Sequence, residues 1–132
     1  MIRRKYLLLF VVSFTLLLVG CDNDLVYQSP DDEWTAETLV SEADVERFGV
    51  DAWFRSETIS DQIFSRMWLK SWKEDCPLNR SELRYLKVLH RNADGNPQRG
   101  EMVVNTVIAD KVIDVFRQLY LADYRIERMV LV

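Results

Sequence analysis

A short apolar run close to the N-terminus constrains this chain most, because it removes that part of the chain from any globular domain. The basic start Met1–Lys5 is followed by thirteen residues, Leu7–Val19, that only Ser13 and Thr15 interrupt. The run is too short to cross a bilayer, which takes about 20 apolar residues. A basic start followed by such a run is typical of a secretory signal peptide. We therefore expect residues 1–20 to be an export signal.

The run ends in Leu18–Cys21, with the sequence LVGC. This ending resembles the bacterial lipobox, and the resemblance implies that the thiol of Cys21 receives a diacylglyceryl group and becomes the first residue. Acyl chains each add roughly 0.8 kcal/mol of membrane affinity per buried methylene. We expect a lipoprotein of the bacterial cell envelope, attached to a lipid bilayer through Cys21. An ordinary signal peptide, or an N-terminal anchor with an incidental cysteine, is the alternative.

The chain has two cysteines and one histidine. With Cys21 acylated, Cys76 has no partner for a disulfide within the chain. We predict a buried or partly buried free thiol at Cys76, with intermolecular pairing as the alternative. An enzyme using Cys76 and His90 is disfavoured, because no residue nearby would activate the thiol.

Charge is distributed unevenly along the chain. Residues 22–61 hold two basic and twelve acidic residues, whereas residues 62–132 hold twelve basic and nine acidic ones. This distribution excludes a nucleic-acid-binding protein that depends on overall basicity. We interpret residues 21–57 as an acidic tether that is extended and hydrated, since like charges repel each other.

Part of this tether is expected to be ordered. The aromatic side chains of Trp34, Trp53 and Phe54 argue against simple disorder and indicate that part of the segment folds back on the domain. A short helix is predicted at Ser41–Phe48, with Ser41 as its N-cap.

Residues 58–132 predict an α+β domain. A helix is expected after Ser60-Asp61, with Trp68 and Trp72 stacked along one of its faces and a break before Pro77. The remaining expected elements are a β-hairpin of Leu83–Arg91 and Gly100–Asn105, a helix at Val107–Ala122 capped by Asn105 or Thr106, and a strand at Met129–Val132.

Ordered blocks in this region carry a resemblance to a known family. They are ISDQIFSRM at 59–67, KEDC at 73–76, LRYLKVLH at 83–90, GEMVVN at 100–105, IADKVIDVFRQLY at 108–120 and IERMVLV at 126–132. Together they resemble the N-terminal part of zinc D-alanyl-D-alanine carboxypeptidase-like proteins, which have the Hedgehog/DD-peptidase fold and cut peptidoglycan stem peptides. The resemblance implies that residues 58–132 are the N-terminal part of such a domain and that a full-length relative binds zinc.

The sequence departs from this family where zinc chemistry is concerned. Neither the pattern S-x-H-x-x-G-x-A-x-D nor the later histidine segment occurs. A zinc site of this type needs three protein ligands and an open position for water, so His90 alone cannot assemble it. We therefore assign no catalytic, cofactor-binding or metal residue in this chain, and expect His90 to be a hydrogen-bonded histidine at a strand end. Two local departures are Leu69, where the family commonly has glycine, and Arg125, where it often has proline.

Two functions remain open. In the first, the chain is the N-terminal portion of a lipid-anchored zinc peptidoglycan peptidase, shortened before its zinc motifs and inactive by itself; the unflanked strand at Met129–Val132 motivates this expectation. In the second, it is a small non-catalytic envelope lipoprotein that binds the cell wall or a protein partner.

Overall fold

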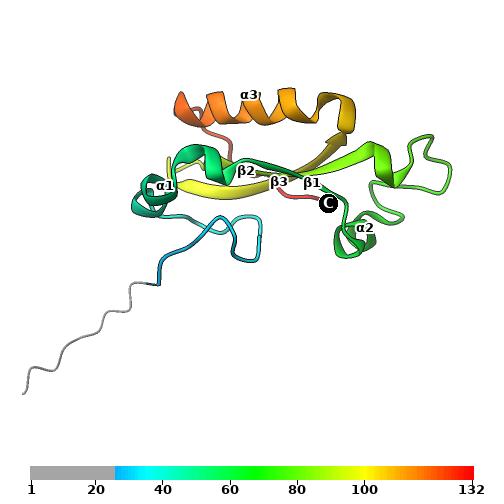
Figure 1. The fold of residues 1–132 in the computed structure, drawn as a ribbon, viewed down its shortest axis with the longest axis horizontal. Coiled ribbons are helices and arrows are strands. Elements are labelled where there is room, and N and C mark those ends of the chain that lie inside the picture. The colour runs from blue at the N-terminus through cyan, green and yellow to red at the C-terminus, as the bar shows by residue number, and fades with distance from the viewer. Residues whose placement is uncertain (1–25) are drawn as a thin grey trace, which may run out of the picture.

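A three-stranded antiparallel sheet, in the order β1-β2-β3, organises this α+β fold (Figure 1). The computed structural model describes residues 26–132, so the expected export signal and Cys21 lie outside the described residues. The helices and strands are α1 (Glu42–Phe48), β1 (Arg55–Thr58), α2 (Asp61–Met67), β2 (Leu83–Arg91), β3 (Pro97–Asn105) and α3 (Ala109–Leu121). Within residues 26–132, no helix is long and apolar enough to cross a membrane.

The predicted hairpin forms with a longer second strand than expected. β3 begins at Pro97, and the pairing runs from Arg91 with Pro97 to Leu83 with Asn105. In the intervening loop the side chain of Asn92 accepts hydrogen bonds from the backbone N–H groups of Asp94 and Asn96. Asparagine side chains favour turns because they satisfy local N–H groups in this way.

The predicted helix starts are confirmed. The side chain of Ser41 accepts from Asp44 N, and that of Ser60 accepts from Ile63 N, as N-caps do. The side chain of Asn105 accepts from Val107 N at the start of the short 3-10 turn that leads into α3. The helix predicted after Ser60-Asp61 is shorter than expected. α2 ends at Met67 and not just before Pro77.

Helices cover the two faces of the sheet. Figure 1 shows α3 on one face and α2, with the segment that precedes α1, on the other. The main core joins α3 to the sheet, and its fully buried members include Trp53, Leu86 and Val88. A second, smaller cluster joins α2 to the opposite face through Ile63 and Met67.

The acidic segment takes part in this core. Val45 and Trp53 are buried in the main cluster, and Trp34 packs against it. The expectation that its aromatic residues fold part of the segment back is therefore confirmed, whereas an extended, hydrated chain does not describe residues 34–54. The segment also supplies β1, a strand that the sequence did not indicate, since Arg55–Thr58 has no apolar alternation.

The strand expected at Met129–Val132 does not form. The backbone there is irregular, although the carbonyl of Met129 accepts from Glu101 N at 3.1 Å along the outer edge of β3. Two residues further on, the N–H of Leu131 donates to the side chain of Glu101 at 3.1 Å and not to a backbone carbonyl of β3, so no ladder continues. The prediction was wrong because a side-chain acceptor replaced the backbone acceptor.

Candidate functional site

One face of the sheet carries charged side chains where apolar ones are usual. Side chains alternate between the faces of a strand, and residues that pair across strands share a face. The pairs Glu57 with Tyr85 and Lys87 with Glu101 therefore lie on one face. The residues of this charged face are Arg55, Glu57, Tyr85, Lys87, Arg99 and Glu101.

The best-connected member of the charged face is Glu101, whose side chain is 1% exposed. Arg66 of α2 donates two hydrogen bonds to its carboxylate, at 3.1 Å and 2.5 Å. The hydroxyl of Tyr85 donates a third, and the N–H of Leu131 a fourth. A buried carboxylate is tolerated only when it is paired in this way. Glu101 thus ties β3 to α2, to β2 and to the segment around Leu131.

These contacts set the ionisation of the cluster. Burial opposes the charge on Glu101, but the hydrogen bonds from Arg66 and Tyr85 outweigh it and hold the pKa of Glu101 below its ordinary value. Burial, together with the hydrogen bond to the carboxylate, raises the pKa of Tyr85. The hydrogen bond to Glu101 raises the pKa of Arg66 despite its partial burial. Glu101 and Arg66 are therefore both charged at neutral pH and form an ion pair, to which the protonated Tyr85 donates.

Arg99 fastens the residues before α1 to the same face. Its guanidinium lies over the rings of Trp34 and Trp53, at 4.9 Å and 5.6 Å from their centroids. It donates to the backbone carbonyls of Glu33 and Ser29, at 2.8 Å and 3.1 Å. Trp34 in turn donates from Nε1 to a carbonyl of β3 at 3.0 Å. The buried guanidinium thereby adds to the apolar packing of Trp34 in holding this segment.

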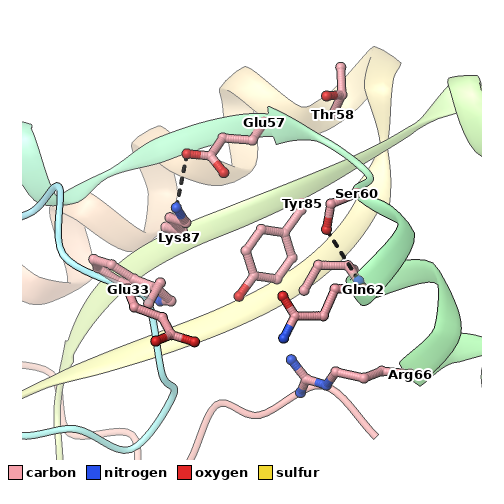
Figure 2. A pocket seen from close by; sticks show the side chains of 10 residues that line it. Glu33, Glu57, Thr58, Ser60, Gln62, Arg66, Tyr85 and Lys87 are labelled. Carbon is pink, nitrogen blue, oxygen red and sulfur yellow. Dashed lines mark hydrogen bonds and ion pairs between the residues drawn. The ribbon is translucent and has the colours of Figure 1, made fainter.

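Between this segment, α2 and the sheet lies a polar pocket of about 170 Å³ (Figure 2). It is lined by Glu33, Trp34, Glu57, Thr58, Ser60, Gln62, Ile63, Arg66, Tyr85 and Lys87. A neighbouring hollow of about 280 Å³ shares Glu33, Gln62 and Arg66 with it and reaches Glu101. We refer to the first of these as the polar pocket.

The polar pocket combines groups that are committed to the fold with groups that are not. Lys87 donates to Glu57 at 3.0 Å, which fixes one carboxylate and one ammonium in the wall (Figure 2). The side chains of Glu33 and Gln62 make no hydrogen bond to any residue of 26–132. The pocket therefore offers an uncommitted carboxylate and an uncommitted amide beside fixed charges of both signs.

His90, the only histidine, lies elsewhere. It is 2% exposed, and its Nδ1 lies 2.7 Å from the carbonyl oxygen of Ile126, so Nδ1 carries the hydrogen. Burial outweighs this hydrogen bond and lowers the pKa of His90. The expectation of a hydrogen-bonded histidine at a strand end is confirmed.

Zinc does not fit the residues that the structure describes. Residues 26–132 contain no group of three histidine, cysteine, aspartate or glutamate side chains placed to hold a metal ion. His90 faces a carbonyl and not a carboxylate or thiol. Cys76 is a free, partly buried thiol in the loop after α2, as predicted for this position, and it does not join His90 in a site.

Sequence reasoning did not single out the residues of the charged face. The alternation of side chains along the second hairpin strand puts Glu101 on the same side as Val103, and this signal could have marked it as a buried carboxylate. It could not identify the partner, because Arg66 lies 35 residues earlier in the chain. Glu33 and Glu57 lie in the acidic segment, which contains so many carboxylates that the sequence could not indicate which of them line a pocket.

Comparisons of this chain with protein-family models, with curated proteins and with solved structures found no match.

Proposed function

We propose that this chain is a lipoprotein of the bacterial cell envelope, acylated on Cys21, whose folded part binds peptidoglycan stem peptides without cutting them. The lipobox-like LVGC ending supports the anchor. The ordered blocks across residues 59–132 support a correspondence to the N-terminal part of a D-alanyl-D-alanine carboxypeptidase-like domain. The polar pocket is the observation that carries the binding role.

The chemistry of the pocket suits such a peptide. A peptide that ends in D-alanyl-D-alanine presents a terminal carboxylate and several amide groups. Lys87 and Arg66 carry positive charge but are already paired with Glu57 and Glu101, whereas the amide of Gln62 is free both to donate to and to accept from a peptide bond. Glu33 offers an acceptor for an amino group. Small-molecule sites typically orient a ligand with a few such polar groups.

Binding and cleavage are separate in this proposal. The pocket contains two carboxylates, Glu33 and Glu57, but among the described residues they belong to no group of three metal-ligating side chains. Peptide hydrolysis by this family's chemistry needs a metal-activated water. We therefore expect the chain to hold a stem peptide intact, with or without added zinc.

The test is titration of a soluble stem peptide ending in D-alanyl-D-alanine into the acylated full chain in detergent, followed by calorimetry. Loss of one hydrogen bond costs about 1 kcal/mol, so Gln62→Ala should weaken binding about fivefold. Glu33→Gln should also weaken it. The control is Gln118→Ala, since Gln118 lies on α3, on the other face of the sheet.

Three results bear on separate parts of the proposal. Equal affinities in the wild type and in all three variants, or no binding at all, would overturn the pocket assignment. Release of D-alanine when zinc is added would contradict binding without cleavage. A mass spectrum that shows no diacylglyceryl group on Cys21 would overturn the anchor alone.

A further inference from the structure

A turn after α2 presents aromatic and basic side chains to solvent. Trp68 and Trp72 stack with ring centroids 5.2 Å apart and an angle of 25°, and Phe64 of α2 packs against both. The carbonyl of Met67 accepts from the N–H groups of Lys70, Ser71 and Trp72, which closes the turn tightly. We call residues 68–73 the aromatic turn.

Leu69, at the tip of the aromatic turn, contributes little to the fold. Its side chain is 64% exposed, and its backbone has φ of 60°, in the left-handed region that favours glycine. A non-glycine residue there costs about 1–2 kcal/mol. Trp68 beside it is 39% exposed. The turn therefore leaves Leu69 largely exposed and Trp68 partly exposed to water, and the left-handed backbone of Leu69 adds a cost in stability.

The charges around these side chains point to one kind of partner. Residues 68–73, with the sequence WLKSWK, contain two basic residues and no acidic one, and Glu74 and Asp75 follow them. Tryptophan and leucine flanked by lysine are the side chains that enter the boundary between lipid headgroups and acyl chains. Exposed Leu69 and neighbouring Lys70 therefore favour a lipid surface.

The stretch of chain between Cys21 and the first described residue is short enough to keep the folded part close to a bilayer that holds Cys21. Only residues 22–25 separate Cys21 from Val26, and five peptide units span at most about 18 Å. The tether is thus far shorter than the sequence suggested, because residues 34–54 belong to the core. Segment 26–36 and α2, which leads into the aromatic turn, lie on the same side of the sheet, opposite α3 (Figure 1).

From this geometry we infer that the aromatic turn inserts Trp68 and Leu69 into the interface of the bilayer that holds Cys21. The inference rests on the proposed acylation of Cys21. The exposed Lys70 and Lys73 of the turn can meet anionic headgroups, while Asp31, in the segment on the same side of the sheet, is paired with Arg55 at 2.7 Å. The domain consequently lies against the membrane in a fixed orientation and is not held off it by a long spacer.

The experiment is tryptophan fluorescence of the acylated full chain in vesicles of zwitterionic and anionic phospholipids with brominated acyl chains, which quench a nearby indole. The wild type should lose a measurable fraction of its emission relative to vesicles without bromine. Trp68→Phe should abolish most of that quenching. Leu69→Gly should reduce it and also stabilise the fold, since it relieves the left-handed strain. The control is Val107→Ser, which alters an exposed apolar residue next to α3.

Equal quenching in the wild type and in Trp68→Phe would overturn the inference, as would quenching that depends on Val107. A fluorescence change with soluble glycan fragments, but none with brominated vesicles, would assign the turn to the wall instead. Mass spectrometry tests the acylation of Cys21 independently of the quenching experiment. If Cys21 is unacylated, the proposed anchor fails, and quenching by brominated vesicles added to that chain still decides whether the turn enters lipid.

Discussion

The hydroxyl of Tyr85 donates its hydrogen to the carboxylate of Glu101, and both side chains are buried between α2 and the sheet. The same carboxylate receives Arg66 from α2. The position of α2, which forms one wall of the polar pocket, therefore depends on a charged contact as well as on the apolar cluster of Ile63 and Met67.

Replacement of Tyr85 by phenylalanine should destabilise the fold. The change removes one donor from a buried, charged acceptor, and hydrogen bonds to charged groups contribute about 1.5–3 kcal/mol. Urea unfolding at pH 7 measures the difference. Tyr124→Phe is the matched control, because Tyr124 is exposed, and it should stay within about 0.5 kcal/mol of the wild type. Equal losses in the two variants would contradict the role of the hydroxyl.

The lowered pKa of Glu101 predicts that the free energy of unfolding decreases in acid. Its pKa in the folded chain is below the ordinary value of 4.5, so the folded state favours the ionised form. Its contribution is present above about pH 4.5 and is lost as the pH falls through the folded-state pKa. In Glu101→Gln, the free energy of unfolding at neutral pH should be lower and should fall less steeply below pH 4.5. Identical slopes for the two chains would show that Glu101 does not carry this dependence.

The lowered pKa of His90 predicts a second pH range, above that of Glu101, in which the stability of the fold changes. Burial lowers its pKa below 6.5, so the folded state favours the neutral ring. Stability is complete above about pH 6.5 and declines as the pH falls below it toward the folded-state pKa. Since the chain has one histidine, one imidazole signal in a proton NMR titration reports this value. A midpoint at or above 6.5 would contradict the burial argument.

Gly100 leaves no room for a side chain. A Cβ there would lie 2.9 Å from Cβ of Met129, 3.0 Å from Cδ2 of His90 and 3.2 Å from Cγ2 of Val88. Gly100→Ala should cost about 1–3 kcal/mol by overpacking, measured by thermal or urea unfolding. Combining it with Met129→Gly should recover part of that loss, because the nearest obstacle, the Cβ of Met129, is removed. Strict additivity of the two changes would refute the contact.

Substitution of Arg99 should loosen one segment of the chain and leave the rest of the fold unchanged. Lysine cannot reproduce its two hydrogen bonds to Ser29 and Glu33 together with its position over two indole rings. In Arg99→Lys, hydrogen exchange of residues 29–36 should accelerate more than that of β2. Arg84→Lys is the control, since Arg84 bonds to Ser56 on β1. Equal acceleration in both variants would argue against Arg99 as the fastening residue.

Local chemistry explains why much of the fold could be predicted. The caps at Ser41, Ser60 and Asn105 involve groups two or three residues apart, and the turn at Asn92 closes within four residues. Such contacts form wherever the right side chain precedes an apolar pattern. β1 escaped prediction because its stability comes from pairing with β2 and not from its own sequence.

The sequence by itself determined the α+β composition, the hairpin and the helix starts, because these depend on propensities and neighbours within a few residues. Only the tertiary structure decided that the acidic segment joins the core, that Glu101 meets Arg66 and Tyr85, and that Leu69 is held exposed in a left-handed turn. These contacts join residues far apart in the chain, so their energies appear only once the sheet has brought the residues together. The polar pocket belongs to the second group, since its walls come from three separate segments.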